Sequence, residues 1–308
     1  MGRRHPMDYS RARTRREVLI RQRRELWTTE QVESLARHFR LKPGMKLLDA
    51  GCGFGYAMRT WGRFCMPGGE LVGLDRSRKL LSQAARFCRK EGLGKAARFV
   101  NGDIYKMPFE DNTFGFTLAH VVFCHLAEPE KALDEMIRVT RPGGCLAVFD
   151  NAMTGSANSR WNNWHQPTIA EQLLTYEVGL RMAAGRRRAG FGDWSVGCYV
   201  PGWMEARGMR DVGVRMNERV VWIAPPYCSP EQQVAYQNMR ERLKESSRFR
   251  LSKGEIEQMR AGGLSRSKYM QNRRRGRAAT RALRKAIRKR TAASAWSSPF
   301  WCIWGLRP

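Results

Sequence analysis

A glycine-rich segment follows the first short apolar run of the sequence and has the composition of a ligand-binding turn. The run ends at Leu48-Asp49, and glycine then stands at positions 51, 53 and 55. Glycine has no Cβ, so it adopts positive φ easily and lets a ligand approach the backbone closely. We therefore interpret residues 47–55 as a strand that enters a cofactor-binding turn, with a helix beginning at about Tyr56.

The spacing of these glycines departs from the dinucleotide-binding fingerprint. In the pattern G-x-G-x-x-G the third glycine would fall at position 56, where this chain has Tyr56, so the pattern here is G-x-G-x-G. A glycine turn alone is also compatible with a tight strand-to-helix connection that holds no ligand. An NAD-dependent enzyme and a turn without a ligand are the two alternatives at this point.

Carboxylates follow the next two apolar runs. Asp75 lies 20 residues beyond Gly55, and a carboxylate at the end of the second strand can accept both hydroxyls of a ribose. Gly102-Asp103-Ile104 closes the third run and offers a carboxylate for an exocyclic amine and an apolar side chain for a purine face. In a doubly wound sheet these strand ends share one edge, which is where such sheets bind ligands.

The elements that must position these residues alternate along the chain. Amphipathic helical patterns, most clearly residues 130–139 before the turn at 141–144, separate short apolar runs. Repeated strand, helix, strand units at this spacing predict an α/β fold with a doubly wound, mostly parallel sheet and helices on both faces. The runs that look like buried strands are 46–50, 71–74, 98–100, 116–121 and 145–149.

The flanks of this core are predicted to be largely helical. Thr28-Thr-Glu-Gln31 indicates a capping box that begins an N-terminal helix, and Thr168-Ile-Ala-Glu171 begins another that runs to about Met182. Residues 211–224 have strand composition, and residues 230–290 have helical propensity. The aromatic run at 299–305 indicates a strand that returns to the sheet after a helical insertion.

These patterns divide the chain into four segments. An N-terminal helical segment precedes the core, and its Tyr9 and Trp27 are placed to form a lid over the cofactor. The core has a cofactor half and an acceptor side. The predicted boundaries are 1–40 for the N-terminal segment, 41–225 for the core with 41–150 as cofactor half and 151–225 as acceptor side, 226–298 for a basic helical insertion, and 299–308 for the returning strand.

With these landmarks in this order, the sequence resembles the class I methyltransferases that use S-adenosylmethionine. The resemblance covers about residues 30–150 and is nearest to members that methylate small molecules. It implies a Rossmann-like sheet of seven strands, S-adenosylmethionine as cofactor and S-adenosylhomocysteine as product. The matching segments are Leu48-Asp-Ala-Gly-Cys-Gly-Phe-Gly55, Gly73-Leu-Asp75, Gly102-Asp-Ile104, and Phe123-Cys-His-Leu126 with Arg141-Pro-Gly-Gly144.

The resemblance also implies which residues hold the cofactor. The first strand and its turn would hold the methionine end, the second strand end the ribose, the third the adenine, and the fourth would lie near the sulfonium. The fourth strand departs most from the family, because Phe114-Gly115 stands where members usually have Phe-Asp. The cofactor residues implied in this way are Asp49, Gly51, Cys52, Gly53, Gly55, Asp75, Arg76, Asp103, Ile104, Ala119 and His120.

Methyl transfer from a sulfonium needs few catalytic groups, because the methyl carbon is already electrophilic. The protein mainly aligns the acceptor with the carbon–sulfur bond and excludes water. A general base helps when the acceptor is a hydroxyl, a protonated amine or a carbon acid, and His120, directly after the fourth strand, is the candidate. The alternative is that His120 only packs or contacts the cofactor. No Cys or His spacing suggests a metal site.

Acceptor contacts must come from outside the core strands. Trp161, Trp164 and His165 follow the fifth strand, and aromatic walls can enclose a flat or cationic acceptor. The alternative is that the two tryptophans pack the following helix on the sheet. The identity of the acceptor atom is left open.

The charge is strongly positive, with 56 Lys and Arg against 28 Asp and Glu, and more than half of the +28 excess lies in residues 226–308. Such a field attracts anions, which include nucleic acid and anionic small molecules. Aromatic residues that stack on bases are sparse between Tyr269 and Trp296, so a solvated arginine face is the commoner outcome. We therefore expect a small-molecule acceptor, and an RNA methyltransferase or a non-catalytic cofactor-binding protein is the alternative.

The eight cysteines form no CxxC pair, the basic N-terminus has no apolar region behind it, and no apolar run approaches the roughly 18 residues of a membrane span. We expect reduced thiols, no membrane span and a cytoplasmic protein.

Overall fold

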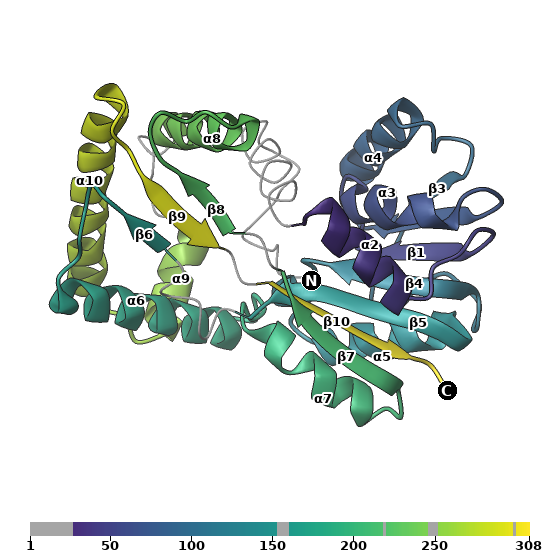
Figure 1. Ribbon diagram of the computed structural model, residues 1–308. Helices are drawn as coiled ribbons and strands as arrows, with labels where there is room; N and C mark the ends of the chain where they lie inside the picture. Colours follow the sequence, from purple (N-terminus) through teal and green to yellow (C-terminus); the bar gives the residue numbers. More distant parts are fainter. Residues whose placement is uncertain (1–26, 153–159, 218–219, 246–251, 298–299) are drawn as a thin grey trace. The chain divides into compact units, whose positions relative to one another are not determined.

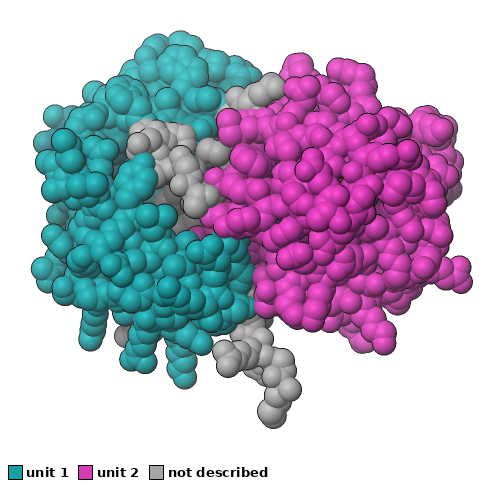
Figure 2. Space-filling view, turned by 90° about the horizontal axis from the view of Figure 1, so that it is seen from below, with its two compact units in different colours: residues 1–7, 153–193, 219–298 teal, residues 8–152, 194–218, 299–308 magenta. Residues whose placement is uncertain are grey.

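The computed structural model describes residues 27–152, 160–217, 220–245, 252–297 and 300–308. These residues fall into two units (Figure 2), and neither is continuous in sequence. Among the described residues, unit 1 contains 160–193 and 220–297, and unit 2 contains 27–152, 194–217 and 300–308. Residues 160–193, which the sequence places on the acceptor side of the core, thus share a unit with the described residues of the basic helical insertion.

Unit 2 is built around a seven-stranded sheet with the order β3-β2-β1-β4-β5-β10-β7 (Figure 1). Strands β1 to β5 pair in parallel, whereas β10 is antiparallel to both of its neighbours. The predicted doubly wound, mostly parallel sheet is therefore confirmed, including the returning last strand. Its strands are β1 (Lys46–Ala50), β2 (Glu70–Asp75), β3 (Ala97–Asn101), β4 (Phe114–His120), β5 (Thr140–Asn151), β7 (Arg210–Met216) and β10 (Phe300–Leu306).

Helices cover both faces of this sheet, and each face has its own apolar core (Figure 1). Successive strand residues point to opposite faces, so Leu47 packs with the first core and Leu48 with the second, and both are fully buried. Side chains of α2 and α3 belong to the first core, and those of α5 and α7 to the second. The helices are α2 (Thr29–His38), α3 (Tyr56–Gly62), α4 (Arg78–Lys90), α5 (Pro129–Val139) and α7 (Val200–Glu205), with short 3-10 turns η1 (Arg63–Cys65), η2 (Phe123–His125) and η4 (Val196–Cys198).

Unit 1 combines long helices with a small antiparallel sheet of order β6-β9-β8 (Figure 1). The predicted helical insertion before the last strand is confirmed by α8, α9 and α10. Helix α6 begins at the predicted Thr168 capping box but extends past Met182 to Arg188. The elements are β6 (Arg160–Asn162), α6 (Ile169–Arg188), β8 (Val220–Ile223), α8 (Pro230–Glu245), α9 (Lys253–Ala261), α10 (Arg266–Arg288) and β9 (Ser294–Ser297).

Residues 211–224 have strand composition in the sequence but belong to two sheets. Strand β7 ends at Met216 and pairs with β10 in unit 2, whereas β8 begins at Val220 and pairs with β9 in unit 1. Composition reports the preference of each residue for extended backbone, and it carries no information about which distant strand becomes the partner. Among the residues that the structure describes, none of the helices combines the length and hydrophobicity that a membrane crossing requires.

Candidate cofactor-binding site

The turn between β1 and α3 has the backbone conformation that its glycines suggested. Gly51, Gly53 and Gly55 have φ of 77°, 55° and 75°, a left-handed region that other residues adopt with difficulty. The backbone N–H groups of Gly51 and Cys52 both donate to the Leu74 carbonyl oxygen at 2.8 Å. The turn is thereby tied to the neighbouring strand β2.

The three glycines differ in what surrounds them. A Cβ on Gly51 would lie 2.7 Å from the Val122 side chain, and one on Gly55 would lie 3.2 Å from Ala84 on α4. A Cβ on Gly53 would meet nothing within 4 Å. Gly51 and Gly55 therefore serve close packing, whereas Gly53 is the position where the backbone of the turn borders open space.

Asp49 and Cys52 are almost fully buried. The Asp49 carboxylate accepts a hydrogen bond from the Met58 N–H at 2.9 Å, which anchors the first turn of α3. A Cβ on Gly73 of β2 would lie 2.8 Å from the Cys52 sulfur, so the thiol packs on that strand. Burial raises the pKa of the Cys52 thiol well above its usual range, so the group is a neutral packing side chain.

Asp75, the last residue of β2, connects three elements through its carboxylate. Oδ2 accepts a hydrogen bond from the Gly53 N–H at 2.9 Å, and Oδ1 accepts one from the Ser77 N–H at 2.8 Å. Ser77 in turn caps α4 by accepting from Leu80 N–H. A carboxylate oxygen can accept more than one hydrogen bond, so Asp75 retains the capacity to accept ligand hydroxyls. The neighbouring Arg76 is exposed.

Asp103 and Ile104 follow β3 along the same edge of the sheet. Asp103 is exposed, and its Oδ1 accepts a hydrogen bond from the Tyr105 N–H at 3.0 Å. Ile104 is half-buried against the second apolar core. The pair therefore presents an exposed carboxylate beside a half-buried apolar side chain.

His120 ends β4 inside an aromatic enclosure and is only 3% exposed. Its Nε2 accepts a hydrogen bond from the Trp27 indole N–H at 3.4 Å. The rings of Tyr56, Phe149 and Phe300 have centroids 5.5 to 5.8 Å from the imidazole. The lone pair of Nε2 already accepts this hydrogen bond and would have to be released before it could take up a proton. The arrangement therefore favours a positioning role for His120 over a role as general base.

Trp27 lies against the core of unit 2. It is 6% exposed and makes edge contacts with Trp61 and Phe149 at centroid distances of 6.4 and 5.5 Å. Tyr9, the other candidate for a lid, lies outside the described residues. Trp27 therefore forms a wall of the His120 enclosure, a role that its position in the sequence did not suggest.

Asp150 is a buried carboxylate at this edge that the sequence analysis left without a role. Its Oδ2 accepts from the Cys124 N–H at 3.0 Å and its Oδ1 from the Asn151 N–H at 2.7 Å. Burial raises the pKa of Asp150 to about 6 against the opposing effect of these hydrogen bonds. The residue holds the η2 turn that follows β4, and a carboxylate directly after the apolar run 145–149 was the signal that could have identified it.

The predicted residues are thus distributed over both units. Unit 2 brings together Asp49, the glycine turn, Asp75, Arg76, Asp103, Ile104, Ala119 and His120 at the ends of β1 to β4. The acceptor candidates Trp161, Trp164 and His165 belong to unit 1. There the Asn162 side-chain oxygen accepts from the backbone N–H groups of Trp164 and His165 at 3.3 and 2.8 Å.

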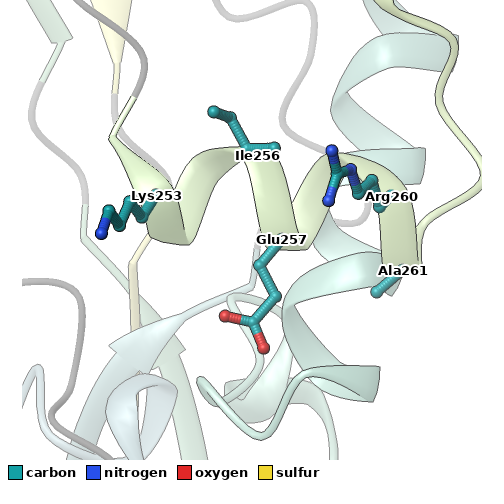
Figure 3. A pocket seen from close by; sticks show the side chains of 5 residues that line it. All are labelled: Lys253, Ile256, Glu257, Arg260 and Ala261. Atoms are coloured by element: carbon teal, nitrogen blue, oxygen red, sulfur yellow. The ribbon is translucent and has the colours of Figure 1, made fainter.

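Unit 1 has a surface hollow of its own. Figure 3 shows its five lining residues, Lys253, Ile256, Glu257, Arg260 and Ala261, all of which come from α9. The lining carries both signs of charge, positive on Lys253 and Arg260 and negative on Glu257. In the part of the chain that the structure describes, no group of three or more His, Cys, Asp or Glu side chains is arranged to hold a metal ion.

Comparison with known proteins finds a methyltransferase domain within unit 2. Residues 48–148 match the family model described as a methyltransferase domain. The chain is 35% identical over 136 residues to cycloartenol-C-24-methyltransferase 1 of Oryza sativa, which covers 42% of this chain and 39% of that protein. It is 38% identical over 170 residues to an uncharacterised methyltransferase of Schizosaccharomyces pombe, with coverage of 54% and 61%.

These matches span less than two thirds of the length of either relative. In shape, the chain is similar to the crystal structure of a candidate methyltransferase from Bacillus halodurans, with a TM-score of 0.50, 14% identity, and coverage of 91% of this chain and 99% of that one. The likeness in shape concerns the fold alone. The match identifies residues 48–148 as a methyltransferase domain, and all the predicted cofactor residues, from Asp49 to His120, lie within it.

Proposed function

We propose that this protein transfers the methyl group of S-adenosylmethionine to a small-molecule acceptor in the cytoplasm. The observation that carries the proposal is the hydrogen bond between the Gly53 N–H and Asp75. It joins the one glycine of the turn that borders open space to a carboxylate that can accept further hydrogen bonds. At adjacent strand ends, the glycine turn would face the amino acid tail of the cofactor and the Asp75 carboxylate would face the ribose of its adenosyl group.

In this proposal each strand end contacts one part of the cofactor. The backbone of the turn at 51–55 holds the methionine end, Asp75 accepts the ribose hydroxyls, and Asp103 with Ile104 contacts the adenine. Arg76, exposed beside Asp75, lies at the rim. Asp49 and Cys52 act through the backbone, because their side chains are buried against α3 and β2.

When bound, the cofactor supplies an electrophilic methyl group on a sulfonium. The chain contributes alignment of the acceptor and exclusion of water. Ala119 and His120 close the end of β4, and the rings around His120 keep this end apolar. His120 holds the position of Trp27 and does not accept a proton in this role.

The acceptor side is proposed to come from residues 151–225 and from the basic insertion at 226–298, with residues 41–150 as the cofactor half. Trp161, Trp164 and His165 are the proposed acceptor contacts. Relatives that align with the cofactor half include the Oryza cycloartenol methyltransferase and a sterol 24-C-methyltransferase of Gibberella zeae, 38% identical over 120 residues. The alignment with the latter covers 31% of its length, and these names support a small-molecule acceptor for this chain.

Thermal unfolding with added ligand tests the proposal. S-adenosylhomocysteine should raise the melting temperature and NAD should not, because a ligand stabilises only the state that binds it. Asp75→Asn should weaken S-adenosylhomocysteine binding by roughly 10- to 100-fold, the value of hydrogen bonds to a charged group. Glu110→Gln, an exposed carboxylate between β3 and β4, serves as control. Stabilisation by NAD alone would contradict the proposal.

RNA is the second candidate acceptor, and helix α10 favours it. The helix contains ten Lys and Arg and no Asp or Glu, and Arg274, Arg277, Arg281 and Arg288 are exposed at intervals of three, four and seven residues. Such a face binds phosphates with a strong dependence on salt. Transfer of labelled methyl groups to RNA, lost in Arg277→Gln/Arg281→Gln, would establish this candidate over the first.

A further inference from the structure

One face of the small sheet in unit 1 carries large apolar side chains that are open to solvent. Trp161 on β6 is 53% exposed, and Trp222 and Val220 on β8 are 58% and 60% exposed. The opposite face is covered, because Val221, Ile223 and Trp296 pack with side chains of the α8 region. The sheet therefore has one ordinary core face and one uncovered apolar face.

The strand register places the two exposed tryptophans in a single row. Trp161 of β6 is directly opposite Ala295 of β9, and Ala295 is directly opposite Trp222 of β8. Residues opposite one another in antiparallel strands point to the same face. Two indoles therefore flank a methyl side chain, and we name Trp161, Ala295 and Trp222 the tryptophan clamp.

The spacing of the tryptophan clamp suits one flat ring system. Adjacent strands lie about 4.8 Å apart, so the backbones of Trp161 and Trp222 are separated by roughly 9.6 Å. Aromatic rings pair at centroid distances of about 4.5–7 Å, so a ring between two indoles needs roughly 9–14 Å between them. The small side chain of Ala295, in the middle strand, leaves the space between the two indoles open. A larger side chain at this position would fill it.

The charge around the tryptophan clamp selects against a cationic ligand. The three strands carry no Asp or Glu, and their one ionisable residue is Arg160. The chain as a whole has a charge of +28. An indole pair can attract a cation through its ring faces, but here no carboxylate on the strands would compensate the charge, and the protein's own field repels it.

We propose that the tryptophan clamp binds a flat, apolar ring system, uncharged or anionic, as the ring portion of the methyl acceptor. The identification of this ligand as the acceptor rests on the proposed function, whereas the binding itself does not. Trp222 is thereby assigned to the acceptor site together with Trp161.

A set of probes that share one ring and differ in charge tests the proposal on the full chain. Quenching of tryptophan fluorescence should show binding of pyrene and of 1-pyrenebutyrate, with markedly weaker binding of 1-pyrenemethylammonium. Trp161→Ala and Trp222→Ala should each weaken binding on the order of tenfold, the value of one lost aromatic pair. Ala295→Leu should block binding while both indoles remain, and Trp222→Phe should restore most of the affinity.

The control variant is Val234→Ala, which removes an apolar side chain of similar exposure (59%) from α8. It should bind pyrene as the unmodified protein does. Three results would each overturn the proposal. The first is an equal loss of affinity in Val234→Ala, and the second is equal binding of the ammonium probe. The third is a dimer of the unmodified protein, in the absence of probe, that Trp222→Ala dissociates. S-adenosylhomocysteine binding is measured in parallel: if it persists while pyrene fails to bind, the clamp is wrong and the methyltransferase proposal stands.

Discussion

Gly53 differs from its two neighbouring glycines in the reason for its conformation. Gly51 and Gly55 are required by packing against Val122 and Ala84, whereas Gly53 has positive φ and open space around it. A methyl group there would occupy the space that the proposal assigns to the methionine end of the cofactor. Positive φ alone costs an alanine roughly 1–2 kcal/mol, so stability and ligand binding must be measured separately.

Gly53→Ala tests this difference, and Gly143→Ala is its matched control. Gly143 also has positive φ (70°), a Cβ there would meet nothing within 4 Å, and its N–H donates to a backbone carbonyl. We expect both variants to lose about 1 kcal/mol of folding free energy. Titration calorimetry should show that Gly53→Ala loses S-adenosylhomocysteine affinity by about tenfold or more, whereas Gly143→Ala keeps it. Equal affinities in the two variants would contradict the assignment.

At the scale of elements, Asp150 connects the end of β5 to the η2 turn after β4. In the unfolded chain its carboxyl ionises near the ordinary pKa of 3.8, whereas in the folded protein burial raises this pKa to about 6. The folded state therefore holds the proton more tightly than the unfolded state. The stability from this group is fully present below about pH 4 and is lost as the pH rises through about 6.

Asp150→Asn removes this ionisation. The variant loses a fixed amount of unfolding free energy at every pH, because its amide has a single acceptor oxygen for the two backbone N–H groups that donate to Asp150. Relative to the unmodified protein it should gain on the order of 3 kcal/mol of unfolding free energy between about pH 4 and pH 7. Urea unfolding across this range measures the difference, with the exposed Glu205→Gln as control. A difference that does not change with pH would refute the account.

Helices α6 and α9 approach each other at glycines. A Cβ on Gly185 of α6 would lie 1.8 Å from the Gln258 carbonyl oxygen, and one on Gly262, directly after α9, would lie 1.9 Å from the Arg181 carbonyl oxygen. Both neighbours are backbone atoms, which cannot move aside as a side chain tip can. The contact therefore depends on the absence of side chains at both positions.

Two alanine substitutions within α6 should have opposite effects. Gly185→Ala should destabilise unit 1 by about 1–3 kcal/mol or more, because the helices must separate. Gly179→Ala, where a Cβ meets nothing within 4 Å, should stabilise the same helix by roughly 0.5–1 kcal/mol. Thermal unfolding followed by circular dichroism compares the two. A stabilising Gly185→Ala would show that the helices do not cross as closely as the structure has them.

At the scale of the whole molecule, the positive charge by itself does not identify the methyl acceptor. The excess of basic residues lies mainly beyond residue 225, while the proposed cofactor residues lie before residue 121. A charge of this size attracts RNA without any specific site, so retention of RNA alone does not identify a substrate. The decisive observation is where the methyl group goes.

Incubation of the protein with a labelled methyl donor and a whole cell extract should place the label in the small-molecule fraction. Ribonuclease treatment before fractionation should leave the labelled product unchanged, because the proposed acceptor is a small molecule. Asp75→Asn should abolish most of the incorporation, whereas Arg277→Gln/Arg281→Gln should not. Label that sediments with RNA and is lost with the two arginines would reverse the order of the two candidates.

The amino-acid sequence by itself predicted the strand ends that the proposal assigns to the cofactor, because their features are local. The glycine turn at 51–55, Asp75 and Asp103 each follow an apolar run, and parallel strands necessarily bring such ends to one edge. The last strand, predicted at 299–305 and found at Phe300–Leu306, was predictable for the same reason, since its aromatic composition is visible without its partners.

The tertiary structure alone decided which distant residues meet. The row of Trp161, Ala295 and Trp222 joins positions more than 60 residues apart, and the burial of His120 depends on Trp27, Phe149 and Phe300. Strand register and core packing are set by contacts between remote segments, whose partners no local pattern specifies. For this reason the methyl donor follows from the sequence, whereas the acceptor surface could be proposed only from the folded chain.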